Sequence, residues 1–90
     1  MITTDNIEIV RGLKVYVFLE IGELRSGVIK DTFSNYFTIR WDDFGETDFP
    51  HNVPFDIFAL ERNGVEYMLR NIRTELVYLK QLLQQFEARL

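Results

Sequence analysis

The final third of the chain carries an unbroken heptad pattern of apolar residues. Eight residues follow one another at alternating spacings of four and three: Val65, Leu69, Ile72, Leu76, Leu79, Leu83, Phe86 and Leu90. This spacing places all eight on one stripe of an α-helix, as in a coiled coil. A helix over residues 65–90 would be about 39 Å long at roughly 1.5 Å per residue, longer than a small preceding domain is wide. We therefore expect part of the stripe to pack against another chain.

The composition of the stripe favours self-association. Leucine occupies every a position of the heptad, and Met68 and Leu82 at g widen the apolar face, which leans toward more than two helices. The alternative is a helix that folds back on its own domain, as amphipathic helices normally do. Both can hold if the first turns pack on the domain and the later turns join chains. The predicted homo-oligomer, a dimer or tetramer, is held by Leu69, Ile72, Leu76, Leu79, Leu83, Phe86 and Leu90.

The preceding residues change to a period of two, which is typical of β-strands. Five strands are predicted, at residues 14–19, 24–31, 36–41, 46–49 and 57–60, with a further short strand at 7–10. Gly27 interrupts the second strand and marks a bulge or sharp bend. Short strands with tight turns predict a small closed barrel, because closure removes exposed strand edges.

The junction between the two parts leaves two alternatives open. Asn63-Gly64 suits a two-residue hairpin, but that register would place Glu61 opposite Glu66, which is unfavourable. In the helical alternative Asn63 is the N-cap and Glu66 occupies the third helical position. We favour the helix, and we expect a β domain at residues 1–62 and an oligomerisation helix at residues 63–90.

Three motifs in the β part resemble those of Tudor and related SH3-like barrels. They are GLKVYV at residues 12–17, RSGVI at residues 25–29 and FTIRWDDFG at residues 37–45. The resemblance covers residues 11–60, and the chain departs from the family pattern where Phe44 is inserted before the glycine. It implies a five-stranded SH3-like or Tudor-like barrel, here followed by the long helix. Such barrels serve as histone readers, nucleic-acid binders and assembly modules, so the fold leaves the function open.

The same resemblance implies an aromatic cage at the open end of the barrel. The candidate ligand-binding residues are Tyr16, Phe18, Tyr36, Trp41 and Phe44, with Asp42 and Asp43 as an acidic rim. Rings and carboxylates in this arrangement attract a cationic group such as methylated lysine or arginine. The alternative is that the rings pack in the core. We expect the partner of the barrel to be a protein segment, held on an aromatic groove or an exposed strand edge.

The distribution of charge disfavours nucleic acid as the partner. The net charge is −4, and residues 1–62 hold 11 acidic against six basic residues. An acidic body repels phosphate at long range. A nucleic-acid-binding regulator, with Lys14, Arg25, Lys30 and Arg40 on one barrel face, is therefore the alternative function. A small acidic inhibitor of a host enzyme is a third possibility.

The residue types present give little support to catalysis. The chain has no cysteine and one histidine, His51, and its serines, Ser26 and Ser34, lie beside predicted turns without an obvious base. The acidic residues between 42 and 48 lack the spacing of a calcium-binding loop. We expect a non-enzymatic protein without metal or cofactor. Because no signal peptide or membrane span is recognisable, we expect it to be cytoplasmic.

Overall fold

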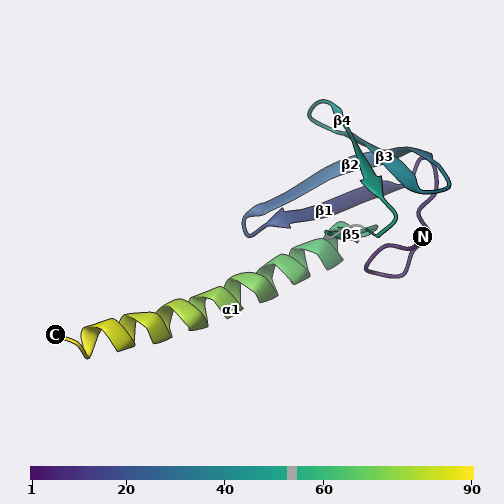
Figure 1. Cartoon of the computed structure of the whole chain (residues 1–90). Coiled ribbons are helices and arrows are strands. Elements are labelled where there is room, and N and C mark those ends of the chain that lie inside the picture. Colours follow the sequence, from purple (N-terminus) through teal and green to yellow (C-terminus); the bar gives the residue numbers. More distant parts are fainter. Residues whose placement is uncertain (53–54) are drawn as a thin grey trace.

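The computed structural model describes residues 1–52 and 55–90 and contains one antiparallel sheet followed by a long helix (Figure 1). The elements are β1 (Lys14–Glu20), β2 (Glu23–Thr32), β3 (Tyr36–Trp41), β4 (Glu46–Pro50), β5 (Asp56–Phe58) and α1 (Glu61–Glu87). The strands lie in the order β4-β3-β2-β1-β5. The five predicted strands and the C-terminal helix are therefore confirmed.

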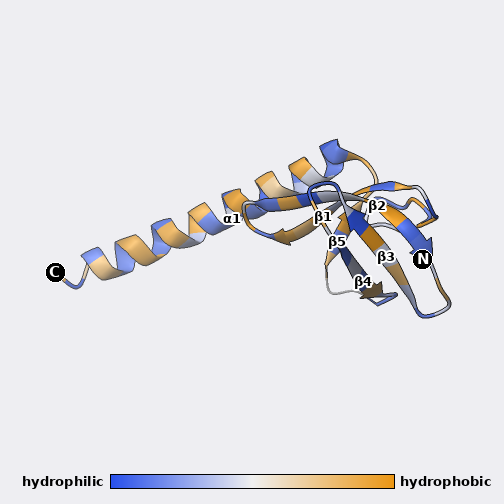
Figure 2. Ribbon diagram, turned by 90° about the horizontal axis from the view of Figure 1, so that it is seen from above, coloured by the Kyte–Doolittle hydropathy of each residue, from blue (hydrophilic) through white to orange (hydrophobic). Residues whose placement is uncertain are grey.

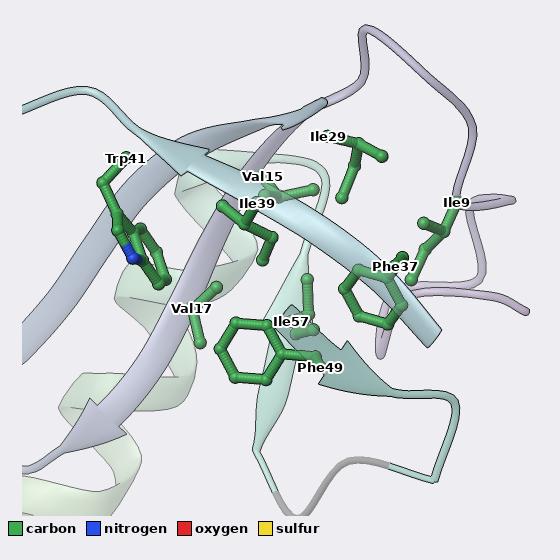
Figure 3. Packing of buried hydrophobic residues seen from close by; sticks show 9 residues of the cluster. All are labelled: Ile9, Val15, Val17, Ile29, Phe37, Ile39, Trp41, Phe49 and Ile57. Atoms are coloured by element: carbon green, nitrogen blue, oxygen red, sulfur yellow. The ribbon is translucent and has the colours of Figure 1, made fainter. Parts of the chain in front are cut away.

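The core lies on one face of the sheet. Its buried residues are Ile9, Val15, Val17, Ile29, Phe37, Ile39, Trp41, Phe49 and Ile57 (Figure 3). Phe49 comes from β4 and Ile57 from β5, the two edges of the sheet, and Figure 3 places both side chains against the same core. The sheet must therefore curl around this cluster, which brings apolar side chains from both edges out of water.

The sheet is nevertheless open, so the predicted closed barrel is not confirmed. The ladder between β2 and β3 shifts register between Ile29 and Asp31, close to the bend expected at Gly27. A Cβ atom on Gly27 would lie 2.6 Å from the carbonyl oxygen of Arg40, so the glycine allows β3 to approach β2 closely. The curl stops short of joining β4 to β5, and both strands remain edges within the described part of the chain.

The N-terminal segment covers the outer edge of β5. The Thr4 N–H donates to the carbonyl oxygen of Ile57 at 2.7 Å, and the Ile57 N–H donates to Thr4 Oγ1 at 3.1 Å. The strand predicted at residues 7–10 is wrong, because this stretch contributes a single isolated bridge to Ile2. Covering β5 in this way satisfies edge groups that could otherwise pair with another chain.

Helix α1 begins at Glu61, two residues before the predicted cap. Leu60 occupies the N-cap position and provides no side-chain hydrogen bond, while Asn63 lies inside the first turn. The hairpin alternative is thus excluded, and the helical alternative is right in type but wrong in its starting residue.

The first turns of α1 pack on the sheet and the rest projects away from it (Figures 1 and 2). Gly64 is buried against Leu24 and Phe58, and the Tyr67 ring packs edge-on against Phe18 with centroids 5.0 Å apart. The molecule measures 57 × 24 × 21 Å as a result. Because a glycine brings the helix backbone close to β2 and β5, these turns dock without a large side chain between them.

Candidate functional site

The heptad stripe of α1 is exposed to solvent along almost its whole length. The exposed fraction is 41% at Val65 and 59% at Leu83. The exposed members of the stripe are Val65, Leu69, Leu76, Leu79, Leu83, Phe86 and Leu90, whereas Ile72 is half-buried. A single chain thus leaves six large apolar residues of one helix face in water, with Leu90 also exposed just beyond the end of α1, more than scattered surface residues explain.

The helix docks on the sheet through a different face. Its contacts come from Gly64, Tyr67 and Met68, which are also related by three- and four-residue spacing. Consecutive helical residues are separated by roughly 100°, so this docking face lies about a quarter turn from the stripe that starts at Val65. The first turns of the helix therefore fold back on the sheet, as the fold-back alternative expects, but they do so through residues outside the stripe. The stripe itself is not covered by the described part of the sheet domain.

One acidic residue far away in the sequence anchors the chain just before the helix, and the sequence analysis missed it. The Asp5 carboxylate accepts hydrogen bonds from the Thr3 hydroxyl at 2.6 Å, the Ala59 N–H at 2.9 Å and the Leu60 N–H at 3.1 Å. The side-chain amide of Asn63 donates to it at 3.0 Å. Partial burial raises the pKa of Asp5, but these hydrogen bonds outweigh that effect and lower it from 3.8 to about 2.

The seven predicted ligand-binding residues fall into three separate places. Trp41, Asp42, Asp43 and Phe44 are neighbours at the hairpin between β3 and β4. Tyr16 and Phe18 lie on the other face of β1, since the alternating Val15 and Val17 face the core, and Phe18 contacts α1. Tyr36 lies at the opposite end of β3 and stacks on Phe33 with centroids 4.5 Å apart. Ligand binding by all seven together remains a prediction.

Trp41 packs mainly in the core, and a cation of the same chain covers its ring. Its indole N–H donates to Thr47 Oγ1 at 2.8 Å, and its ring packs edge-on against Phe49. The Arg25 guanidinium lies 4.4 Å from the ring centroid, in the position that a cationic ligand would take. A ligand of that kind would have to displace Arg25.

Arg25 also holds the hairpin in one conformation. Its guanidinium donates to Asp43 Oδ1 at 3.1 Å and to the Phe44 carbonyl oxygen at 3.2 Å. The hydrogen bond from Arg25, together with that from the Phe44 N–H, lowers the pKa of Asp43. The neighbouring Asp42 is hydrogen-bonded to Lys14 and Ser26, which lowers its pKa in the same way. Both carboxylates therefore stay charged at neutral pH.

The four basic residues that the nucleic-acid alternative needs are each paired with a carboxylate. Lys14 pairs with Asp42, Arg25 pairs with Asp43, and Lys30 and Arg40 share Glu46 at 3.0 and 3.5 Å. Pairing offsets the positive potential that would attract phosphate. A hollow of about 280 Å³ lies beside Lys30 and Arg40, and Arg11 completes its basic lining.

Ser26 and His51, the polar residues considered for catalysis, both contact other side chains of the sheet domain. The Ser26 hydroxyl donates to Asp42 at 2.7 Å, and the His51 ring stacks on Phe37 with centroids 6.3 Å apart. Within residues 1–52 and 55–90, no group of three or more acidic, histidine or cysteine residues is placed to hold a metal ion. In the same residues, no helix has the length and apolar character needed to cross a bilayer.

Comparisons with protein-family models, with curated proteins and with solved structures found no match for this chain. The resemblance to Tudor and SH3-like barrels therefore stays a prediction from three sequence motifs. The exposed surfaces are then the basis for a function, and the stripe on α1 contains the largest number of exposed apolar residues on one element.

Proposed function

We propose that this protein is a non-enzymatic, homo-oligomeric binding and scaffolding module, in which α1 joins copies and the sheet domain recognises a protein segment. The observation that carries the proposal is the exposed heptad stripe, which continues past the docked turns to Phe86, its last residue within α1. A stripe with this repeat is complementary to a second copy of itself, because side chains at a and d interlock between equivalent helices.

The energetics support association through the whole stripe. Fully burying a large apolar side chain stabilises by about 1.5 to 3 kcal/mol, so covering one that is half exposed contributes about 1 kcal/mol. Two helices with six such residues each would gain about 12 kcal/mol, which is comparable to the cost of association, about 4 to 15 kcal/mol. Association should therefore need most of the stripe. Met68 is used in docking on the sheet domain, so Leu82 is the additional apolar residue that supports more than two helices.

The sheet domain is proposed to be a small barrel of the SH3-like or Tudor-like kind that acts in the cytoplasm. Its three sequence motifs and the curl of its sheet around one core support the fold, and the lack of cysteine suits a reducing compartment. Joined copies of a weak binding domain gain avidity without any new contact, which is the advantage of a scaffold.

The mass of the full chain in solution tests the proposal. Sedimentation equilibrium should give a multiple of the 10.7 kDa chain mass, and Leu79→Asp combined with Leu83→Asp should reduce it to one chain. The matched control is Gln81→Asp with Gln84→Asp, which adds the same charge to the opposite face of α1 and should leave the oligomer intact. A wild-type chain that sediments as a folded monomer at high concentration would contradict the proposal.

A further inference from the structure

A fully exposed aromatic ring stands at the tip of the β3–β4 hairpin. Phe44 is 86% exposed, whereas Phe33 stacks on Tyr36 and Phe55 packs edge-on against Phe49. A single exposed apolar residue is ordinary on a protein surface, but aromatic side chains are frequent anchors of protein interfaces.

The hairpin holds the backbone that carries this ring. Gly45 has a φ of +86°, and its carbonyl oxygen accepts the Trp41 N–H at 2.9 Å, which closes the turn. The Phe44 N–H donates to Asp43 Oδ1 at 2.9 Å, and the Phe44 carbonyl oxygen accepts from Arg25. Both backbone polar groups of Phe44 are therefore satisfied inside the loop, and Arg25 connects the loop to the buried Trp41. A ring on an ordered backbone costs less conformational entropy to bind than a ring on a disordered loop.

The hollow beside Arg11, Lys30 and Arg40 has the complementary character. Gly12, Val28, Ile29 and one acid, Asp31, complete its lining, so bases outnumber acids three to one, and its volume of about 280 Å³ is sufficient for a phenyl ring. The outermost charges on the two surfaces are opposite. In the ion pair at the hairpin the acid is the more exposed side chain, since Asp43 is 71% exposed and Arg25 is 32% exposed. In the ion pair beside the hollow the base is the more exposed side chain, since Arg40 is 62% exposed and Glu46 is 39% exposed.

We propose that Phe44 of one copy inserts into the hollow between Arg11, Lys30 and Arg40 of a second copy, with Asp43 facing the basic rim. This contact is separate from the helix stripe, so it would link helix-joined oligomers into larger assemblies. It rests on the proposed function for its biological use, since one ring in a shallow hollow gives weak binding that becomes effective when copies are already joined.

The test uses the full chain with Leu79→Asp and Leu83→Asp, which removes the stripe and isolates the second contact. Heteronuclear NMR spectra recorded from about 0.05 to 1 mM should show concentration-dependent shifts of Phe44, Gly45, Gly12 and Val28 amides, because weak contacts exchange rapidly. Adding Phe44→Ala to this background should abolish the shifts, whereas the matched control Phe33→Ala should retain them.

A mixing experiment assigns the two halves of the contact. An isotope-labelled Phe44→Ala chain retains the hollow but lacks the ring. The amide signals of its Gly12 and Val28 should shift when unlabelled chain with an intact Phe44 is added. The same signals should not shift when unlabelled Phe44→Ala chain is added. Arg11→Glu in the labelled chain should weaken the binding about tenfold, and Arg11→Lys should preserve it.

The inference is overturned if no shifts occur up to 1 mM, if they map elsewhere on the surface, or if they persist without Phe44. A Phe44 that binds a different protein would give the first of these results. Because the stripe is disabled in every sample, this outcome is independent of whether the wild-type chain sediments as an oligomer.

Discussion

Replacing Asp5 with asparagine tests whether a residue at the start of the chain stabilises the helix at its end. The pKa of Asp5 is lowered from 3.8 to about 2 in the folded chain, a difference of about 1.8. At 1.36 kcal/mol for each pKa unit, this corresponds to at most about 2.4 kcal/mol of stability from the charged form. Since the carboxylate is partly exposed, solvent screening reduces the expected loss in Asp5→Asn to about 1 to 1.5 kcal/mol at pH 7.

The pH dependence identifies the charge as the cause. A carboxylate with a lowered pKa in the folded state stabilises fully above its unfolded value of 3.8 and loses its contribution as the pH falls toward about 2. Urea unfolding at fixed chain concentration should thus show a gap between wild type and Asp5→Asn that is constant from pH 7 to about pH 5 and nearly closed at pH 2. The control Glu8→Gln, an exposed acid of the same segment, should leave stability within about 0.5 kcal/mol of wild type.

A gap of the same size at pH 7 and pH 2 would refute this reasoning. The effect of Asp5→Asn would then come from geometry alone, and the charge of the carboxylate would not strengthen its hydrogen bonds to the Ala59, Leu60 and Asn63 groups.

Two further predictions concern the sheet domain. Gly27→Ala should lower the free energy of unfolding by about 2 kcal/mol or more, measured by thermal or urea unfolding. The added Cβ would lie 2.6 Å from the Arg40 carbonyl oxygen, and neither strand backbone can move away easily. Unchanged stability would mean that β2 and β3 approach each other less closely than described. Binding of mixed-sequence duplex DNA at 50 mM salt, measured by fluorescence anisotropy, should be weaker than a Kd of about 100 μM. The reason is that four basic residues of the sheet domain are each paired with an acid: Lys14, Arg25, Lys30 and Arg40. Tighter binding that weakens with salt would restore the nucleic-acid alternative.

Local periodicity was sufficient to find the strands and the helix. In β3, the alternation of Phe37, Ile39 and Trp41 with polar residues predicted one buried face, and those three residues are buried in the core. The heptad likewise predicted α1, because side-chain spacing along a helix depends on local geometry alone. The bounds of β5 and the start of α1 were less accurate, since both depend on contacts with residues near the N-terminus.

The candidate site was predicted less completely. The stripe residues from Val65 to Phe86 lie on α1 as the heptad predicted, and all except Ile72 are exposed, whereas the predicted helix end at Leu90 is wrong because α1 ends at Glu87. Self-association through the stripe stays a prediction. The aromatic set was chosen from motifs, and the fold distributes it over two faces and both ends of the sheet. Nothing in the local sequence signals that Arg25 would lie over Trp41, since these residues become neighbours only through the pairing of β2 with β3.

The element types, the burial pattern of the strands and the apolar stripe could all be predicted from the sequence, because each follows from the spacing of apolar residues along a locally regular backbone. Three features arise only from the folded chain: the sheet curls without closing, the helix docks through the face of Gly64 and not through its stripe, and Asp5 anchors the residues just before α1 across more than fifty residues. These features depend on contacts between distant segments, whose geometry results from packing of the whole chain, and no local pattern encodes them.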